Sequence, residues 1–243
     1  MGNFSPIMQQ LIDKGFIILQ DIFSTEEVRS IVNTITRADP SGPVFRITND
    51  LFAIRQFLKV IPEIQPLVFN SNIVTIIKEY FGHDYFVIKS IYFDKPERSN
   101  WMVAWHQDLT LSVDKKLDLP GFSHWTAKQE QWAVQPPRDI LESIFTLRIH
   151  LDDTDEHNGA LKIIPGSHLK GVCRAEDIDW RTEQEEICKV KKGGIMIMRP
   201  LLLHASNRTT NNNKRRVLHI EFCNQALPGG LDWSEIIDTK SFT

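Results

Sequence analysis

Three pairs of a histidine and a carboxylate, each with one residue between them, are the part of the sequence best suited to chemistry. The pairs are His106 with Asp108, His150 with Asp152, and His219 with Glu221. Side chains at positions i and i+2 of a β-strand point to the same face, so each pair would present an imidazole and a carboxylate together. With one further histidine, such a pair forms the 2-His-1-carboxylate triad that binds Fe(II) and leaves coordination positions open.

The surroundings of His106 and Asp108 distinguish this pair from the other two. The pair ends an apolar strand predicted over 102–108 and opens into a long segment without a clear period. His204 follows 98 residues after His106, within a leucine-rich strand predicted over 201–205. A histidine there is either a core residue with satisfied hydrogen bonds or a third ligand, and the spacing alone leaves both interpretations open.

The last predicted strand, 216–223, separates polar from apolar residues. One face carries Arg215, Val217, His219 and Glu221, and the other carries Arg216, Leu218, Ile220 and Phe222. The strand predicted over 145–152 repeats this pattern. A barrel with a chemical pocket would turn the polar face inward, whereas an ordinary sheet would turn it to water. The pattern permits both arrangements.

Length and composition exclude several classes of protein. A chain of 243 residues with 42% hydrophobic and 24% charged residues is typical of one sizeable globular domain. Its 28 basic and 31 acidic residues sum to a net charge of −3, which disfavours a nucleic-acid-binding protein. Apolar runs stay well short of the ~20 residues of a membrane span, so we expect no membrane partner. Three unclustered cysteines indicate free thiols and a cytoplasmic protein.

We expect the N-terminal part, 1–83, to be mostly helical. Ser24 and Glu27 form a capping-box pattern ahead of an amphipathic run. Gly82 is a typical helix end. The predicted elements are a strand over 15–19, a helix after Ser24, and helices over 51–60 and 71–81.

From residue 84 the chain changes to short β-branched and aromatic segments bounded by Gly, Pro and Asn. Strands are predicted over 85–93, 102–108, 145–152, 161–164, 187–190, 195–198, 201–205 and 216–223. This order predicts a mainly β fold with some α: a double-sheet jelly roll with N-terminal helices packed on one sheet. We expect a single domain over 1–243, with the jelly-roll core over 84–224, a lid segment over 109–140 and a C-terminal tail over 225–243.

The order of these motifs resembles the phytanoyl-CoA dioxygenase family. The similar segments are Trp105-His106-Gln107-Asp108, Asn158-Gly-Ala-Leu-Lys-Ile-Ile-Pro-Gly-Ser-His168, His204-Ala205-Ser206, and Arg215 eleven positions after His204. The segment 15–28 is also similar to the opening of that family, so the resemblance spans nearly the whole chain. The resemblance implies a double-stranded β-helix and an Fe(II)- and 2-oxoglutarate-dependent oxygenase.

Carried over residue by residue, the resemblance implies three iron ligands: His106, Asp108 and His204. Arg215 matches the arginine that holds the distal carboxylate of 2-oxoglutarate, a task that suits a planar, permanently charged, bidentate group. Ser206 matches a second contact to that carboxylate, and Arg148 matches a position in the wall of the cosubstrate site. His168 ends a turn that is structural in the family. The other two histidine–carboxylate pairs fall outside the family's ligand positions.

The implied reaction uses Fe(II), 2-oxoglutarate and O₂ to hydroxylate a C–H bond, with release of succinate and CO₂. We expect a small-molecule substrate. The alternatives are a protein hydroxylase with the same chemistry and a non-catalytic jelly-roll binding protein. Arg46, Trp125 and Lys128 are the candidate substrate residues. We expect some of the cations Arg46, Arg55 and Lys128 to face an acidic group of the substrate, unless the charges of this region are only solvated. Neither the identity of the substrate nor the oligomeric state follows from the sequence.

Overall fold

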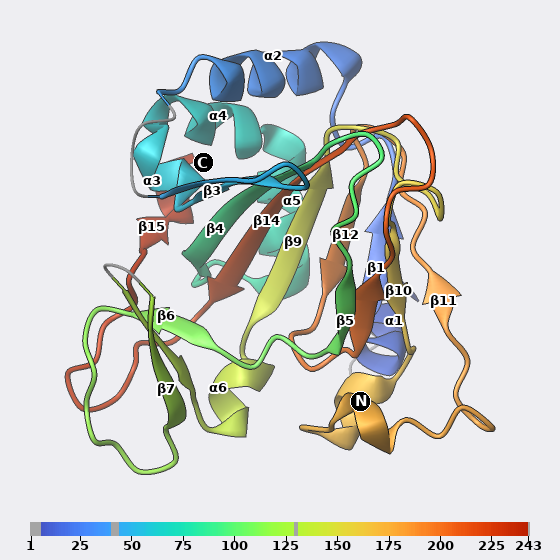
Figure 1. Cartoon of the computed structure of the whole chain (residues 1–243). Helices are drawn as coiled ribbons and strands as arrows, with labels where there is room; N and C mark the ends of the chain where they lie inside the picture. Colours follow the sequence, from blue (N-terminus) through green and yellow to red (C-terminus); the bar gives the residue numbers. More distant parts are fainter. Residues whose placement is uncertain (1–5, 40–43, 129–130, 243) are drawn as a thin grey trace.

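Two facing β-sheets form the centre of the molecule (Figure 1). The computed structural model describes residues 6–39, 44–128 and 131–242. The larger sheet contains β1 (Phe16–Leu19), β2 (Phe45–Ile47), β3 (Phe52–Arg55), β4 (Phe86–Lys95), β9 (Phe145–His150), β12 (Ile195–Met198), β14 (Arg215–Cys223) and β15 (Ile237–Asp238). The smaller sheet contains β5 (Val103–His106), β10 (Leu161–Ile163), β11 (Glu186–Ile187) and β13 (His204–Ser206). The strand orders are β1-β12-β9-β14-β4-β3-β2, with β15 paired to β4, and β11-β10-β13-β5.

Helices from the N-terminal part cover the outer face of the larger sheet (Figure 1). They are α1 (Pro6–Lys14), α2 (Thr25–Thr36), α3 (Phe57–Val60), the 3-10 turn η1 (Pro62–Ile64), α4 (Gln65–Val68) and α5 (Ser71–Phe81). Ile31 of α2 and Ile73 of α5 share one buried apolar cluster with Leu147, Ile149 and Ile220 of the sheet. The predicted packing of helices on one sheet is confirmed. The apolar faces of β9 and β14 meet the helices, and their polar faces therefore turn toward the smaller sheet.

The predicted start of α2 and the predicted end of α5 are both found in the structure. The Ser24 hydroxyl accepts a hydrogen bond from Glu27 N, and the Glu27 carboxylate accepts one from Ser24 N, which completes the capping box of α2. α5 ends at Gly82, whose φ of 93° lies in the region that favours glycine.

The prediction of a helix over 51–60 is wrong in its first half. Residues Phe52–Arg55 form β3, and only Phe57–Val60 are helical. β3 pairs with β4, and these backbone hydrogen bonds come from a strand more than thirty residues away, which local periodicity does not reveal. Gln56, at φ 52°, separates the strand from the helix. The N-terminal part thus contributes β1, β2 and β3 to the larger sheet and is not simply helical.

Strand register gathers charged side chains on the inner face of the larger sheet. On this face, Arg215 of β14 lies opposite Lys95 of β4, and Glu221 of β14 lies opposite Lys89 of β4. A row across β3, β4, β14 and β9 contains Arg55, Ile91, His219 and Arg148. Side chains alternate along a strand, so all of these residues point toward the smaller sheet. This inner face is therefore rich in cations.

The predicted lid segment is a small sheet of its own. Its strands are β6 (Leu111–Val113), β7 (Ser123–Lys128) and β8 (Gln131–Gln135), in the order β6-β8-β7, followed by α6 (Arg138–Glu142). Trp125 and Trp132 pack against a buried cluster that includes Val113 and Trp233 of the tail. The remaining short elements are η2 (Ser167–Lys170), η3 (Ala175–Asp177) and η4 (Thr239–Phe242).

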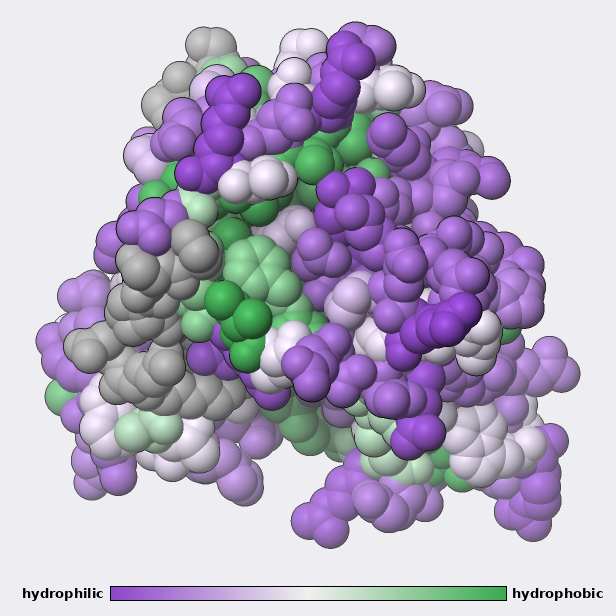
Figure 2. Space-filling model, turned by 45° about the horizontal axis from the view of Figure 1, so that its top comes forward, coloured by the Kyte–Doolittle hydropathy of each residue, from purple (hydrophilic) through white to green (hydrophobic). Residues whose placement is uncertain are grey.

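The surface seen in Figure 2 is mostly hydrophilic, and its hydrophobic side chains gather in a central hollow. Within the described residues, the helices are too short or too polar to cross a membrane.

Candidate metal centre

The three predicted metal ligands lie together between the sheets. His106 ends β5, Asp108 follows it by two residues, and His204 begins β13. β5 and β13 are neighbours, with His106 directly opposite His204 and their ring centroids 4.2 Å apart. One ligand atom from each residue lies within 4.8 Å of the other two. Asp108 Oδ1 is 3.9 Å from His106 Nε2, and Asp108 Oδ2 is 3.8 Å from His204 Nε2.

Backbone carbonyls orient both imidazoles. Nδ1 of His106 lies 2.8 Å from the carbonyl oxygen of Ala104, and Nδ1 of His204 lies 2.8 Å from that of Leu202. A carbonyl only accepts, so each Nδ1 carries the hydrogen and each Nε2 keeps a free lone pair. Asp108 Oδ2 is buried and has no hydrogen-bond partner in the described part of the chain. Two imidazoles and a carboxylate therefore offer unused lone pairs at one point, which fits Fe(II).

The charges around the triad favour the protonation states that a metal requires. Burial raises the pKa of Asp108, but electrostatic attraction to His204, to His219 and to the ammonium of Lys89 outweighs burial and brings this pKa to about 2. Burial lowers the pKa of His204 to about 4, against the opposing effect of Asp108. At neutral pH the carboxylate is ionised and His204 is neutral, and metal binding needs both.

Gln107 anchors the two ligands that flank it. Its side chain is buried, and Nε2 donates to the carbonyls of Gly171 and Leu201 at 2.8 and 2.6 Å. Its Oε1 accepts from Cys173 N at 2.9 Å. These bonds tie the ligand pair to the segment that leads into β13. Gln107 carries no motif that assigns it a role, although its position between two predicted ligands was an available signal in the sequence.

A cavity of about 160 Å³, here called the central cavity, lies between the sheets beside the triad. It is lined by Phe93, Trp101, Val103, His106, Asp108, Arg148, Leu161, His204, Ser206, Arg215 and His219. Arg215 is buried, and its Nε and Nη1 have no hydrogen-bond partner among the described residues. Unpartnered guanidinium nitrogens in a buried site are costly, so this part of the cavity fits a bound carboxylate.

Ser206 and Arg148, for which the family resemblance implies positions beside the cosubstrate, also line the central cavity. The Ser206 hydroxyl donates to the carbonyl of Gly159 at 2.8 Å. For Ser206 to bind a carboxylate as well, its hydroxyl hydrogen would have to turn from the carbonyl of Gly159 to that carboxylate. Arg148 donates from Nη1 to His219 Nδ1 at 3.0 Å, and its buried Nε lacks a partner in the described structure.

A chain of hydrogen bonds forms one wall of the central cavity. Because arginine only donates, His219 Nδ1 accepts from Arg148, and His219 Nε2 must carry the hydrogen that it donates to Glu221 Oε1 at 3.1 Å. Lys89 Nζ donates to the same oxygen at 2.8 Å. Burial raises the pKa of Glu221, but Lys89 and His219 outweigh burial and lower it. His219 and Glu221 are therefore committed to each other and to their neighbours, and they form part of the wall.

In the third histidine–carboxylate pair, Asp152 is committed elsewhere, whereas His150 keeps a buried Nε2 without a partner among the described residues. Asp152 accepts two hydrogen bonds from the Arg216 guanidinium, at 2.7 and 2.8 Å. The His150 Nδ1 is 2.8 Å from the hydroxyl of Thr154. His168 Nε2 is 3.0 Å from a carbonyl oxygen of α1, a contact consistent with a structural role.

Two of the three candidate substrate residues lie outside the central cavity. Arg46 is exposed on β2. Trp125 packs against the buried cluster that includes Val113 and Trp233. Lys128 ends β7, and its side chain lies outside the described part of the structure.

Lys95 is a site residue that the sequence analysis missed. It is buried beside Arg215, and its ammonium donates to the carbonyl of Asn207, which follows Ser206. Burial, together with the charge of Arg215, lowers the pKa of Lys95 to about 7. A Cβ on Gly159 would lie 2.6 Å from this ammonium nitrogen, so glycine leaves the space that Lys95 fills. No local signal in the sequence connects these residues.

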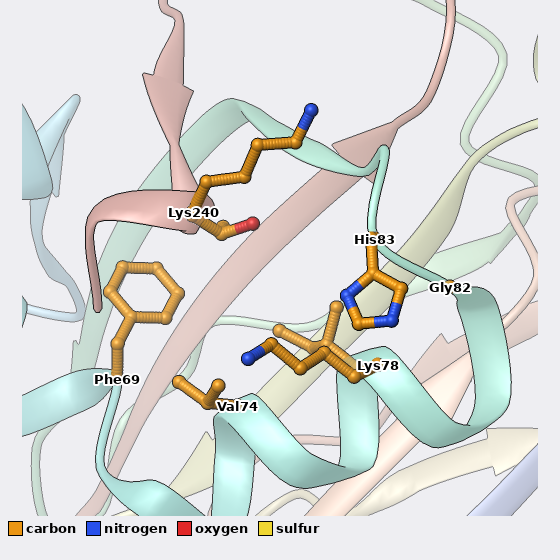
Figure 3. A pocket seen from close by; sticks show the side chains of 8 residues that line it. Phe69, Val74, Lys78, Gly82, His83 and Lys240 are labelled. Carbon is orange, nitrogen blue, oxygen red and sulfur yellow. The ribbon is translucent and has the colours of Figure 1, made fainter. Parts of the chain in front are cut away.

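A separate cavity of about 210 Å³ lies in the helical layer (Figure 3). Phe69 and Val74 provide apolar surface there, and Lys78, His83 and Lys240 bring basic side chains to it. It shares no residue with the central cavity, so we do not connect it with the metal centre.

Comparisons with known proteins agree with this geometry. The family model of phytanoyl-CoA dioxygenase (PhyH) matches residues 12–217. A protein of Stutzerimonas stutzeri, described as a probable alpha-ketoglutarate-dependent hypophosphite dioxygenase, is 24% identical over 179 residues. The match covers 68% of this chain and 54% of that protein, so the chain spans about half the length of this curated relative.

Solved structures share the fold. EctD from S. alaskensis, determined with 2-oxoglutarate and 5-hydroxyectoine, has a TM-score of 0.68 and 19% identity, with 89% of this chain and 74% of that chain covered. The alpha ketoglutarate dependent carbocyclase SnoK from nogalamycin biosynthesis has a TM-score of 0.67 and 16% identity, with 91% and 85% covered. The predicted jelly-roll fold is confirmed. Because the family model covers most of the chain, including all three triad positions, this protein belongs to the phytanoyl-CoA dioxygenase family.

Proposed function

We propose that this protein is an Fe(II)- and 2-oxoglutarate-dependent oxygenase that hydroxylates a C–H bond of a small molecule, with His106, Asp108 and His204 as the iron ligands. One observation carries the proposal. Both histidines have Nδ1 committed to a backbone carbonyl, and their Nε2 atoms and an unpartnered oxygen of Asp108 converge within 4.8 Å. This is the donor set of a site with open coordination positions.

The other residues of the central cavity suit a cosubstrate. Arg215 would bind the distal carboxylate of 2-oxoglutarate through its two free nitrogens. Ser206 would add a second contact, and Arg148 would form the wall beside it. When bound, Fe(II) and 2-oxoglutarate supply the O₂-dependent oxidation, with succinate and CO₂ as products. The contribution of the chain is to orient the reactants and to exclude water.

A small-molecule substrate is supported by the size of the site. The central cavity is about 160 Å³, a volume that suits a small molecule, and its inner end is formed by buried side chains such as Arg148, His204 and Arg215. The cation-rich inner face favours a substrate with a carboxylate or another acidic group. The relative described as a hypophosphite dioxygenase is consistent with a small anionic substrate.

We further propose that residues 1–243 act as one catalytic domain. β1, β3 and β15 all belong to the larger sheet, so both ends of the chain complete the sheet that carries Arg215. The lid sheet, made of β6, β7 and β8, begins three residues after Asp108 and is joined to the tail by a backbone bridge between Val113 and Trp233.

The proposed function is tested by anaerobic absorption spectroscopy of the purified chain. Addition of Fe(II) followed by 2-oxoglutarate should produce a visible metal-to-ligand charge-transfer band that requires both additions. His204→Ala should lose the band, and His83→Ala serves as the matched control, because His83 is exposed and lines only the cavity of the helical layer. A folded wild-type protein that gives no band would overturn the proposal and would favour a non-catalytic binding protein.

A further inference from the structure

Arg148 is a buried cation of the central cavity that lacks a carboxylate partner among the described residues. Its exposed fraction is 7%, and the one hydrogen bond of its side chain in this part of the chain runs from Nη1 to Nδ1 of His219 at 3.0 Å. Its Nε is buried without a partner in the same ranges. A neutral acceptor does not balance a buried guanidinium, which is stabilised when an anion lies beside it. This part of the cavity therefore suits a ligand that supplies a negative charge.

The two buried arginines of the central cavity face different ends of it. Arg148 lies opposite His219 in the larger sheet, and His219 is four positions along β14 from Arg215, which is about 13 Å of backbone. Burial lowers the pKa of Arg148 to about 10, and attraction to the triad residue Asp108 opposes that effect. Burial and the charge of Arg148 lower the pKa of Arg215 to about 9. Arg148 is thus the arginine nearer the triad, and Arg215 lies at the end that contains Lys95.

The position of the hydrogen on His219 decides whether Arg148 is held in this direction. Nδ1 can accept from Arg148 only in the tautomer that carries its hydrogen on Nε2. Glu221 stabilises that tautomer, because its ionised carboxylate accepts from Nε2 at 3.1 Å. In the other tautomer, the Nδ1 hydrogen would face the Arg148 donors, and the Nε2 lone pair would face the carboxylate. Lys89 donates to the same oxygen of Glu221 at 2.8 Å and to the carbonyl of Thr110 at 3.3 Å, which closes the outer end of this chain of hydrogen bonds.

We propose that His219, fixed in one tautomer by Glu221, is a positioning residue that aims Arg148 at the carboxylate of the cosubstrate nearest the triad. The proposal rests on the proposed oxygenase function and adds a second cation to its cosubstrate site. A dicarboxylate such as 2-oxoglutarate would meet one guanidinium at each end, Arg148 beside the triad and Arg215 at the distal end. His219 acts through Arg148 and needs no contact of its own with the ligand.

The tautomer is tested on the wild-type chain without metal. The chain is labelled with ¹⁵N-histidine, and its long-range ¹H–¹⁵N correlation spectrum is recorded near neutral pH, with the His219 signals assigned by their loss in His219→Asn. We expect hydrogen on Nε2 and none on Nδ1. Glu221→Leu should lose this preference, whereas Glu221→Gln, which keeps an oxygen for Nε2, should retain it. Hydrogen on Nδ1 in the wild type, or an unchanged tautomer in a folded Glu221→Leu, would overturn the proposal.

The effect on the ligand is tested with variants that differ in the acceptor offered to Arg148. His219→Asn keeps an oxygen acceptor near the place of Nδ1, whereas His219→Leu offers none, and both leave Lys89 paired with Glu221. Arg148→Gln removes the charge itself, and His83→Leu is the matched control, because His83 is exposed and lines the cavity of the helical layer instead. Each variant is loaded anaerobically with Fe(II) and titrated with 2-oxoglutarate, and binding is followed by the visible band and by calorimetry. Iron content and circular dichroism monitor the metal and the fold.

We expect His219→Leu and Arg148→Gln to bind 2-oxoglutarate about 10- to 100-fold more weakly than the wild type, the range for a charged hydrogen bond, with iron retained. His219→Asn should recover part of the affinity, and His83→Leu should match the wild type. The double variant should bind no more weakly than Arg148→Gln alone, because His219 acts only through Arg148.

Three results would each overturn the proposal: unchanged affinity in His219→Leu or Arg148→Gln, equal losses in His219→Asn and His219→Leu, or a further loss in the double variant. If His219→Leu does not fold, the wild-type spectrum and Arg148→Gln still decide the question. Absence of the visible band in the wild type would instead overturn the proposed oxygenase function.

Discussion

Arg215 and Lys95 occupy directly opposed positions on β14 and β4, and both side chains are buried. Two cations that face each other across a strand pair destabilise the sheet unless other groups compensate them. The carbonyl of Asn207 compensates Lys95, whereas two nitrogens of Arg215 have no partner in the described structure. This end of the central cavity thus carries excess positive charge and suits the distal carboxylate of 2-oxoglutarate.

Replacement of Arg215 should weaken the binding of 2-oxoglutarate without removing the metal. Arg215→Gln should raise the KM for 2-oxoglutarate by about 10- to 100-fold, because a charged hydrogen bond to a carboxylate is lost. Fe(II) binding should be retained, since Arg215 is not a member of the triad. Succinate formation against 2-oxoglutarate concentration measures the first effect, and iron content measures the second. An unchanged KM would contradict the assignment.

The choice among the histidine–carboxylate pairs can be tested directly. Asp108→Ala removes the anionic ligand and should abolish Fe(II) binding and substrate oxidation. His150→Ala should retain Fe(II), because His150 lies outside the ligand cluster. Iron content after anaerobic loading and gel filtration compares the two variants, with circular dichroism as the control for folding. The reverse result, with iron retained by Asp108→Ala and lost by His150→Ala, would mean that the wrong pair was assigned.

Substitution of Gly159 by alanine should destabilise the fold far more than substitution of Gly82, although both glycines have a positive φ, 86° and 93°. A Cβ on Gly159 would meet Lys95 Nζ at 2.6 Å and Asn207 O at 2.8 Å, whereas a Cβ on Gly82 meets nothing within 4 Å. Gly159→Ala should therefore lower the free energy of unfolding by about 1–3 kcal/mol more than Gly82→Ala does. Urea unfolding of both variants measures the difference. Equal losses would indicate that the site around Lys95 is not tightly packed.

Glu235 should make the stability of the fold depend on pH. Burial raises its pKa to about 7, against the opposing hydrogen bonds from the Ser90 backbone and hydroxyl. A glutamate in the unfolded chain titrates near 4.3, so between about pH 4 and 7 the folded state binds the proton more tightly. Protonated Glu235 therefore stabilises the fold fully below about pH 4, and this stabilisation, at most about 4 kcal/mol, is lost as pH rises from about 4 through about 7.

Glu235→Gln should remove this dependence. The free energy of unfolding of the variant, relative to the wild type, should increase as pH rises from 5 to 8 in urea titrations. Glu63→Gln is the control, because Glu63 is exposed and its replacement should leave the pH profile of the wild type unchanged. Parallel profiles for wild type and Glu235→Gln would show that Glu235 does not titrate in this range.

Much of this protein follows from short-range signals in its sequence. The alternation of polar and apolar residues along 216–223 predicts a two-faced strand, and the Ser24–Glu27 box predicts the start of a helix, because both depend on neighbours within a few residues. The pair His106 and Asp108, together with His204 and Arg215, was identifiable from spacing and family resemblance. These features determined the fold class and the candidate metal centre.

Other features depend on which strands become neighbours, and only the tertiary structure decided them. β3 is a strand because the edge of β4 supplies its hydrogen bonds, although its residues also fit a helical period. Lys95 faces Arg215, and Arg55 lies in the row of His219, because the register of β4 places them there. Register arises from pairing between segments far apart in the chain, so local patterns determine which face a side chain occupies but not which side chain it meets.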